Sequence, residues 1–158
     1  MSQLFATFRL DEALFGVPVL QVQEVIRYQQ MTPVPLASDV VEGLINLRGQ
    51  IVTALDLRRR IALPPRPQDW LPMNVVVDTD DGPVSLLVDE IGDVLEVHEE
   101  DFEGAPASIQ ARMDGLVDGV YKLKGQLLLV LNVERTVNFA GGRLGATAPD
   151  GSICHETA

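Results

Sequence analysis

The chain contains one stretch twice. Residues 41–61 align without a gap on residues 117–137, and seven of the 21 positions are identical. Unrelated segments of this length share roughly one identical position, so the similarity indicates an internal repeat. The repeat predicts that one structural unit is built twice. The identical pairs are Val41 and Val117, Gly43 and Gly119, Leu47 and Leu123, Gly49 and Gly125, Gln50 and Gln126, Leu55 and Leu131, and Arg59 and Arg135.

Each copy predicts the same order of elements. A basic residue and a glycine form a tight turn, which opens directly onto an apolar run at 51–55 or 127–131. Such runs are typical of strands buried on both faces, although periodicity alone leaves a buried helical segment open. Asp56 or Asn132 follows, and these side chains can cap a helical turn. The basic residue and glycine are Arg48 and Gly49 in the first copy, and Lys124 and Gly125 in the second.

The remaining segments are short and mostly extended. We expect hairpins at residues 4–20 and 74–88 and an extended, proline-containing connector at 31–36. Residues 22–26 fit either a short helical turn or an irregular strand, and the sequence does not decide between them. They correspond loosely to residues 91–95, so the similarity between the two halves of the chain extends beyond the repeat.

Short strands with closely spaced turns favour a mainly β fold, and two small barrels are the simplest architecture. The chain of 158 residues is long enough for one compact domain or two small lobes around a shared core. We expect a first barrel over about residues 1–68 and a second over about 69–140. Residues 141–158 are rich in Gly, Ala and Pro and predict a mobile tail.

Charge excludes one class of partner. The net charge is −11, which argues against nucleic acid because phosphates would repel the chain. Residues 1–68 carry seven basic and six acidic side chains, whereas residues 69–158 carry five and seventeen. This asymmetry fits two ends that meet different partners, and it equally fits drift of a solvated surface.

The sequence also predicts a cytoplasmic location. No apolar run approaches the roughly 20 residues that span a bilayer, and no signal-peptide pattern is present, so we expect no direct membrane insertion. The single cysteine, Cys154, excludes an internal disulfide and reads as an incidental thiol.

Few residues could carry chemistry. His98 and His155 have no nucleophile motif near them and no ligand spacing with Cys154, so we expect no catalytic residue, metal or cofactor. The triplet at residues 58–60 reads as a solvated helical face. Turn and surface roles explain the acidic residues more simply than paired catalytic carboxylates do. They are Asp78, Asp80, Asp81, Asp89 and Glu90.

Arg48 is the strongest candidate for a functional side chain. It follows the apolar residues Ile45 and Leu47 and precedes a turn glycine that fixes its direction. A planar cation with five donors would therefore stand on a rigid frame. It could be an interface anchor or an ordinary surface arginine.

The segment GLINLRGQIVTALDLR (43–58) resembles the signature of the chemotaxis coupling protein CheW family. Three other segments are similar to the same family in the same order: FATFRLDEALFGVPVLQVQEVIR, VVVDTDDGPVSLLVDEIGDVLEV and GVYKLKGQLLLVLNVERTV. The resemblance covers about residues 4–139. Thr53 departs from it, standing where the family frequently has proline, and the tail has no usable counterpart.

The resemblance implies two SH3-like five-stranded β-barrels around a shared core. It implies an adaptor that joins chemoreceptor tips to the regulatory domain of the histidine kinase CheA, recruited to membrane-associated receptor arrays. The family's receptor-coupling positions fall on Val22, Glu24 and Arg48. Gly43 and Val75 match positions of coupling or kinase contact. Relatives serve chemotaxis, pilus-based motility and other signalling outputs, so the pathway stays open.

Two function classes follow. An adaptor predicts binding surfaces without a catalytic pocket, whereas an enzyme requires a convergent polar site that this sequence does not display. The adaptor hypothesis is the one we carry forward.

Overall fold

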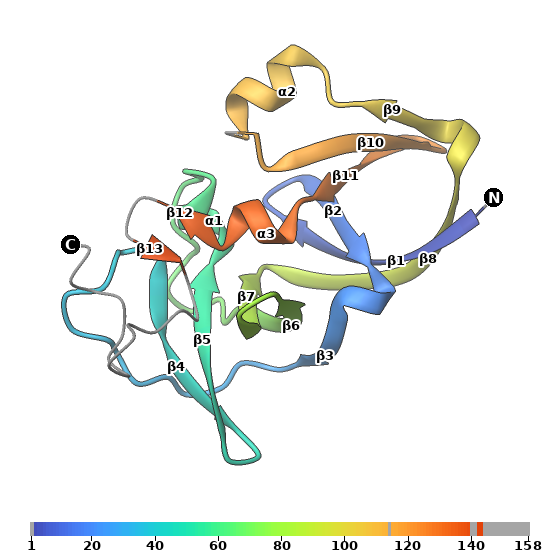
Figure 1. Ribbon diagram of the computed structural model, residues 1–158. Coiled ribbons are helices and arrows are strands. Elements are labelled where there is room, and N and C mark those ends of the chain that lie inside the picture. Colours follow the sequence, from blue (N-terminus) through green and yellow to red (C-terminus); the bar gives the residue numbers. More distant parts are fainter. Residues whose placement is uncertain (1, 114, 140–141, 144–158) are drawn as a thin grey trace.

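The computed structural model describes residues 2–113, 115–139 and 142–143 (Figure 1). The predicted tail at 141–158, with Cys154 and His155, lies outside the described residues apart from 142–143. The chain is mainly β. The strands are β1 (Ser2–Leu10), β2 (Ala13–Pro18), β3 (Val22–Ile26), β4 (Val41–Leu47), β5 (Gln50–Asp56), β6 (Met73–Thr79), β7 (Gly82–Val88), β8 (Glu90–His98), β9 (Phe102–Gly104), β10 (Val117–Leu123), β11 (Gln126–Leu131), β12 (Asn138–Phe139) and β13 (Gly142–Arg143). The helices are α1 (Leu57–Arg60), α2 (Ala107–Arg112) and α3 (Val133–Thr136), with 3-10 turns at Val19–Gln21 and Glu99–Asp101.

Two curled sheets make up most of the molecule, and each forms a small SH3-like barrel (Figure 1). The middle barrel is formed by residues 22–88 and has the strand order β3-β6-β7-β5-β4. The terminal barrel has the order β8-β1-β2-β11-β10-β9 and combines residues 2–18 with 90–131. The short strand β9 adds a sixth strand to the five that the sequence led us to expect.

The sheets do not follow the expected division near residue 68. Each barrel exchanges a hairpin with the other half of the chain, because β1–β2 joins the C-terminal strands and β6–β7 joins the first repeat copy. Both exchanges use a parallel pair, β2 with β11 and β7 with β5. Parallel pairing between distant segments leaves no mark in local sequence, which explains why the boundary was wrong.

Both copies of the repeat adopt the predicted elements. The first copy forms β4, β5 and α1, and the second forms β10, β11 and α3. The correspondence extends to details of backbone geometry: each hairpin has a register shift at its start, between Val41 and Gly43 and between Val117 and Gly119. Asp56 and Asn132 cap α1 and α3 with their side-chain oxygens, as predicted.

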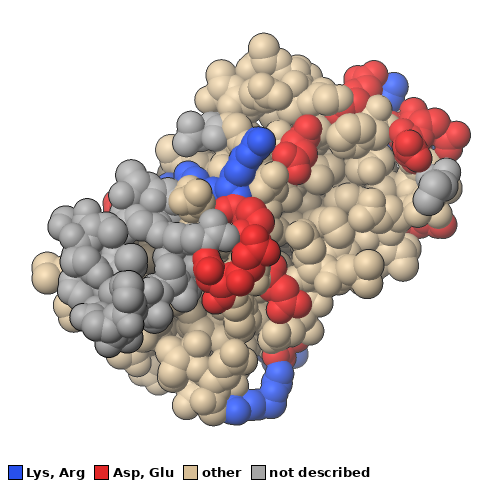
Figure 2. All heavy atoms as spheres, viewed as in Figure 1, with Lys and Arg blue, Asp and Glu red and all other residues tan. Residues whose placement is uncertain are grey.

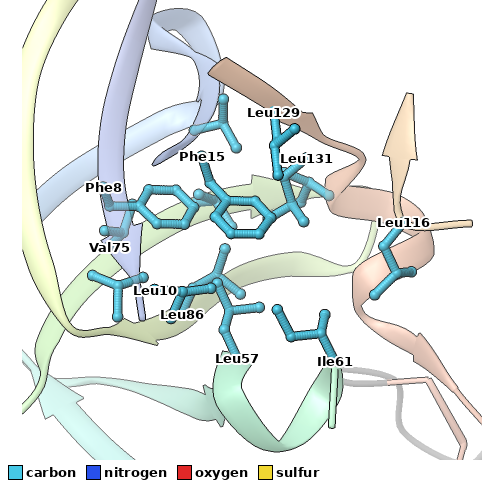
Figure 3. Close-up of a cluster of buried hydrophobic side chains, with 14 of the residues drawn as sticks. Phe8, Leu10, Phe15, Leu57, Ile61, Val75, Leu86, Leu116, Leu129 and Leu131 are labelled. Atoms are coloured by element: carbon cyan, nitrogen blue, oxygen red, sulfur yellow. The ribbon is translucent and has the colours of Figure 1, made fainter. Parts of the chain in front are cut away.

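The two barrels share one large apolar core, whose side chains converge between the sheets (Figure 3). Phe8 and Phe15 stack in it with ring centroids 6.0 Å apart. A smaller cluster fills the interior of the terminal barrel. It consists of Phe5, Leu14, Val97, Tyr121, Leu128 and Val130. The shared core consists of Phe8, Leu10, Phe15, Val17, Leu55, Leu57, Ile61, Val75, Val77, Val84, Leu86, Val88, Leu116, Val117, Val120, Leu129, Leu131, Val133 and Val137.

Candidate functional site

Arg48 stands at the tip of the β4–β5 hairpin. Its φ of 52° and the φ of 87° at Gly49 give a turn with two left-handed residues, the kind that matches the twist of two-residue hairpins. The Asn46 side chain accepts a hydrogen bond from the Gly49 amide at 2.9 Å and fixes the turn. The Arg48 side chain is 75% exposed. The structure therefore displays this cation on a rigid frame, as the sequence predicted.

Glu24 on β3 forms an ion pair with Arg48, so the structure brings together two of the predicted receptor-coupling residues. Only 19% of the Glu24 side chain is exposed. Residues 22–26, left open between helix and strand by the sequence, form the strand β3, which pairs with β6. An ion pair of this kind at the surface contributes about 0–1 kcal/mol to stability. Its contribution to the fold is therefore small.

Val22 begins the same strand and packs partly against the shared core. The antiparallel pairing of β3 with β6 shifts register between Val22 and Glu24. Val25 and Ile51, the latter three residues past Arg48, add apolar side chains that are 41% and 61% exposed. The candidate coupling surface is defined here as Val22, Glu24, Val25, Arg48 and Ile51.

Gly43 and Val75 do not belong to this surface. Val75 is 1% exposed and lies in the shared core, and Gly43 is buried beneath the connector that precedes β4. A Cβ atom on Gly43 would lie 2.7 Å from the carbonyl oxygen of Thr32. Neither residue therefore presents a side chain to a partner in this conformation, and their assignment to receptor or kinase binding stays a prediction. Either residue could act only through the packing that supports the surface.

A second polar site, missed from the sequence, is buried at the junction of the barrels. Arg58 was expected on a solvated helical face and Asp89 in a surface turn, but Arg58 is 5% and Asp89 3% exposed. The Arg58 guanidinium donates from Nε to Asp89 Oδ1 at 2.8 Å and from NH2 to Oδ2 at 2.6 Å. Arg66 donates from Nε to Asp89 Oδ1 at 2.9 Å. The available signal was the apolar run at residues 86–88 directly before Asp89, which places it at the end of a buried strand.

The protonation equilibria follow from this geometry. Burial by itself would raise the pKa of Asp89, but hydrogen bonds from Arg58, the Asp11 amide and Arg66 outweigh it and lower that pKa below its usual range. The hydrogen bond to Asp89 likewise raises the pKa of Arg58. Both shifts favour the ionised forms of Asp89 and Arg58.

Arg60 makes a further connection across the repeat. Its Nε donates to the carbonyl oxygen of Thr136 at 2.8 Å, and its NH2 donates to those of Arg135 and Asn138 at 3.0 and 3.2 Å. The Arg135 and Thr136 carbonyls lie at the end of α3, where a helix leaves acceptors unsatisfied, whereas Asn138 begins β12. One residue of α1 thus caps the equivalent helix of the other copy.

Charged side chains are unevenly distributed on the surface. Figure 2 shows acidic side chains gathered over the middle and the upper right of one face, and basic side chains both beside them and at the lower tip, where Figure 1 places the β4–β5 turn. The middle barrel, residues 22–88, carries six basic and eight acidic residues. The terminal barrel, residues 2–18 and 90–131, carries four and eleven. The asymmetry seen in the sequence halves therefore persists between the barrels, in reduced form.

His98 lies exposed on β8. Within residues 2–113, 115–139 and 142–143, no group of three or more His, Cys, Asp or Glu side chains is placed to hold a metal ion. In the same ranges, no helix is long and apolar enough to cross a membrane.

Comparisons with known proteins agree with the fold and the order of the segments. The family model described as the CheW-like domain matches residues 4–140. The chemotaxis protein CheW of Treponema pallidum is 29% identical over 133 residues, which cover 82% of this chain and 78% of that protein. CheW of Bacillus subtilis is 29% identical over 131 residues, covering 83% and 84%. The crystal structure of the scaffolding protein TtCheW from Thermoanaerobacter tengcongensis superposes with a TM-score of 0.83 at 24% identity, over 91% of this chain and 98% of that one.

Proposed function

The chain belongs to the CheW-like family, and from this premise we propose that it is a non-catalytic adaptor. It couples the cytoplasmic tips of chemoreceptors to the regulatory domain of the histidine kinase CheA in a chemosensory array. The relatives that match over most of the chain are chemotaxis proteins, and a solved relative of the same fold is described as a scaffolding protein. The site of action is cytoplasmic, at the membrane-associated receptor array. The output is chemotaxis, pilus-based motility or another response.

The observation that supports this proposal most directly is the exposed Arg48 with its partner Glu24. A protein does not need this pair for stability, because surface ion pairs contribute little. Arg48 is nevertheless displayed on a rigid turn, and Val25 in β3 and Ile51 in β5 are 41% and 61% exposed. Arginine is one of the residue types that most often act as anchors in protein interfaces. The receptor tip is the partner we assign to this surface, which comprises Val22, Glu24, Val25, Arg48 and Ile51.

The kinase domain requires a separate surface, because one patch cannot hold two partners at once. The terminal barrel is strongly acidic and supplies a surface that differs electrically from the coupling surface. Contacts made by acidic side chains weaken as salt screens them, whereas apolar contacts respond less. Kinase binding should therefore depend more on ionic strength than receptor binding does.

The repeat offers a matched test. Arg48→Glu and Lys124→Glu make the same change of charge at equivalent turn positions of the two barrels. Arg48→Glu should weaken receptor binding by about thirtyfold, equivalent to about 2 kcal/mol, and leave the melting temperature unchanged. Lys124→Glu should leave receptor binding within about twofold.

Binding would be measured by titration of a receptor cytoplasmic fragment and, separately, of a kinase regulatory domain. Unchanged receptor affinity in Arg48→Glu would make Arg48 an ordinary surface residue. Equal losses in both variants would show a general effect of charge and would remove the assignment of the coupling surface. Failure of the wild-type chain to bind either partner would overturn the adaptor proposal.

A further inference from the structure

The chain passes between the two barrels at only two places in the described ranges 2–113 and 115–139. The first passage, Val19–Gln21, leads from β2 of the terminal barrel to β3 of the middle barrel. The second is a single residue, Asp89, which lies between β7 of the middle barrel and β8 of the terminal barrel. Any rotation of one barrel against the other must change the backbone at these two passages.

Asp89 is held from four directions. Its Oδ1 accepts hydrogen bonds from Nε of Arg58 at 2.8 Å and Nε of Arg66 at 2.9 Å. Its Oδ2 accepts from NH2 of Arg58 at 2.6 Å and from the Asp11 amide at 2.7 Å. A carboxylate offers about four lone-pair sites, and all of them are used here. The carboxylate can therefore turn or shift only by breaking a hydrogen bond.

The donors come from both barrels. Asp11 lies in the β1–β2 turn of the terminal barrel, and the backbone amide of Asp89 also donates to the Arg9 carbonyl there at 3.0 Å. Arg58 belongs to α1 of the middle barrel, and Arg66 belongs to the segment between α1 and β6. One carboxylate thus connects three segments whose relative placement defines the angle between the barrels.

The shared apolar core alone does not define that angle as sharply. Hydrophobic burial holds the barrels together but has no direction. A guanidinium fork on a carboxylate does have direction, because its two parallel hydrogen bonds form in only one plane. Buried ion pairs add little net stability, so their best-supported role is to select one arrangement among several. In the other passage, Val19–Gln21, no residue is buried and Leu20 is 92% exposed.

We propose that the Asp89 cluster (Asp89, Arg58, Arg66 and the Asp11 amide) fixes the orientation of the two barrels, so that Asp89 is a positioning residue for bridging. The functional part of this inference rests on the proposed adaptor role. An adaptor that holds one partner on each barrel transmits a fixed geometry only if the barrels cannot rotate. The cluster touches neither proposed partner, and it acts through the angle between their binding surfaces.

The orientation can be measured in the isolated protein. Spin labels would be attached at Gln50→Cys in the middle barrel and Lys124→Cys in the terminal barrel, both exposed, with Cys154 replaced by serine. Pulsed electron–electron double resonance then gives the distribution of distances between the labels. Asp89→Asn should broaden or shift this distribution relative to the otherwise identical protein. A distribution that Asp89→Asn leaves unchanged would overturn the proposal.

Two further variants keep the test decisive. Val88→Ala removes a buried core side chain from the residue directly before this passage without touching the charges, so it should lower the melting temperature and leave the distribution unchanged. If it broadens the distribution as much as Asp89→Asn does, the effect is general loosening and the proposal fails. If Asp89→Asn does not fold, Arg66→Gln removes one of the two guanidinium groups and decides the question by the same criterion.

Binding tests the functional part separately. Each partner alone should bind Asp89→Asn within about threefold of the wild-type affinity, because the partner surfaces are intact. Binding of the second partner to the complex with the first should weaken by about tenfold. An unchanged ternary affinity would remove the bridging role while leaving the distance result in place. Absence of partner binding to the wild type would instead remove the adaptor function.

Discussion

The two passages between the barrels occupy equivalent places in the two halves of the chain but differ in chemistry. After β2 the chain makes an exposed 3-10 turn with the apolar Leu20 at its centre, whereas after β7 it crosses through the buried Asp89. Both passages follow a hairpin and lead into a strand that pairs with the other half of the chain. The same topology therefore leaves one passage accessible to solvent and makes the other a fixed joint.

The two repeat copies differ in a related way. Helices α1 and α3 have equivalent caps, but the residue that follows two positions after the cap is Arg58 in the first and Glu134 in the second. Arg58 turns inward to Asp89, whereas Glu134 accepts a hydrogen bond from the Asp80 amide at 3.0 Å in the β6–β7 turn. Equivalent positions of the two copies thus carry different residues that contact different parts of the molecule.

The largest difference between the passages should appear in stability. Asp89→Asn removes the negative charge that pairs with the buried guanidinium groups of Arg58 and Arg66. Breaking a buried ion pair in this way lowers the free energy of unfolding by about 3–5 kcal/mol. Leu20→Asn at the exposed passage should change the free energy of unfolding by less than about 0.5 kcal/mol. Denaturant unfolding of both variants checks this expectation. Similar values for the two would show that the passages are energetically alike.

The repeat copies should be equally sensitive in their cores. Leu55 and Leu131 occupy equivalent positions in β5 and β11 and are 0% and 2% exposed. Truncation of either to alanine leaves a cavity in the shared core and should cost about 2–5 kcal/mol. Because the core is shared, binding of both partners should fall together in either variant. A loss confined to one partner would mean that each barrel has an independent core.

The dependence of stability on pH should report Asp89. Its pKa is lowered in the folded protein, so the ionised form stabilises the fold above the unfolded pKa of about 3.9. This stabilisation is lost as the pH falls from about 4 through the lowered folded pKa. The wild type should therefore lose more stability than Asp89→Asn between about pH 5 and pH 2. Parallel curves for the two proteins in unfolding titrations would contradict the assignment.

Substitution of Gly43 or Gly119, which are equivalent in the two repeat copies, should have a smaller effect on stability. A Cβ on Gly43 would lie 2.7 Å from the Thr32 carbonyl oxygen, and one on Gly119 would lie 2.7 Å from that of Glu103. Backbone atoms obstruct both positions, and at Gly119 the Phe102 ring would lie closer still, so each alanine variant should cost about 1–3 kcal/mol by overpacking. Calorimetric melting of the two variants measures this. A neutral Gly43→Ala would show that the connector over β4 yields easily and that the glycine is not needed for close packing.

Local features of the fold were predictable, whereas long-range pairing was not. The turn glycines, the apolar runs and the caps at Asp56 and Asn132 are set by neighbouring residues, and the structure confirms all of them. The parallel pairs that exchange hairpins depend on segments dozens of residues apart, so the boundary near residue 68 was wrong. The burial of Arg58 depends on Asp89, 31 residues away, for the same reason.

The residues of the candidate site also divide into those set by their neighbours in sequence and those set by long-range pairing. Arg48 owes its display to the adjacent glycine and was predictable, and its partner Glu24 came from the family resemblance. Val75 matched a family position, but its burial is a property of the sheet and not of the segment. Sequence similarity can therefore identify positions that affect a surface without showing which of them touch a partner.

The smallest expected effect separates the two hairpin tips. Arg48 has a φ of 52°, whereas Lys124, among the described residues, is not one of the non-glycine residues with positive φ. A left-handed arginine carries a steric penalty, and asparagine before glycine suits a turn with two left-handed residues. Arg48→Asn should therefore stabilise the protein by up to about 1 kcal/mol, while Lys124→Asn should change stability by less than about 0.5 kcal/mol.

The same Arg48→Asn variant should lose receptor binding, because the guanidinium is gone. Opposite changes in stability and affinity would show that arginine is kept at this turn for contact with a partner and at the expense of the fold. Lys124→Asn should change neither quantity, which controls for a general effect of asparagine in these hairpins. Thermal unfolding and receptor titration on the two variants measure both quantities. If Arg48→Asn destabilises the hairpin, the ion pair with Glu24 outweighs the backbone penalty and the turn has no conflict between folding and binding.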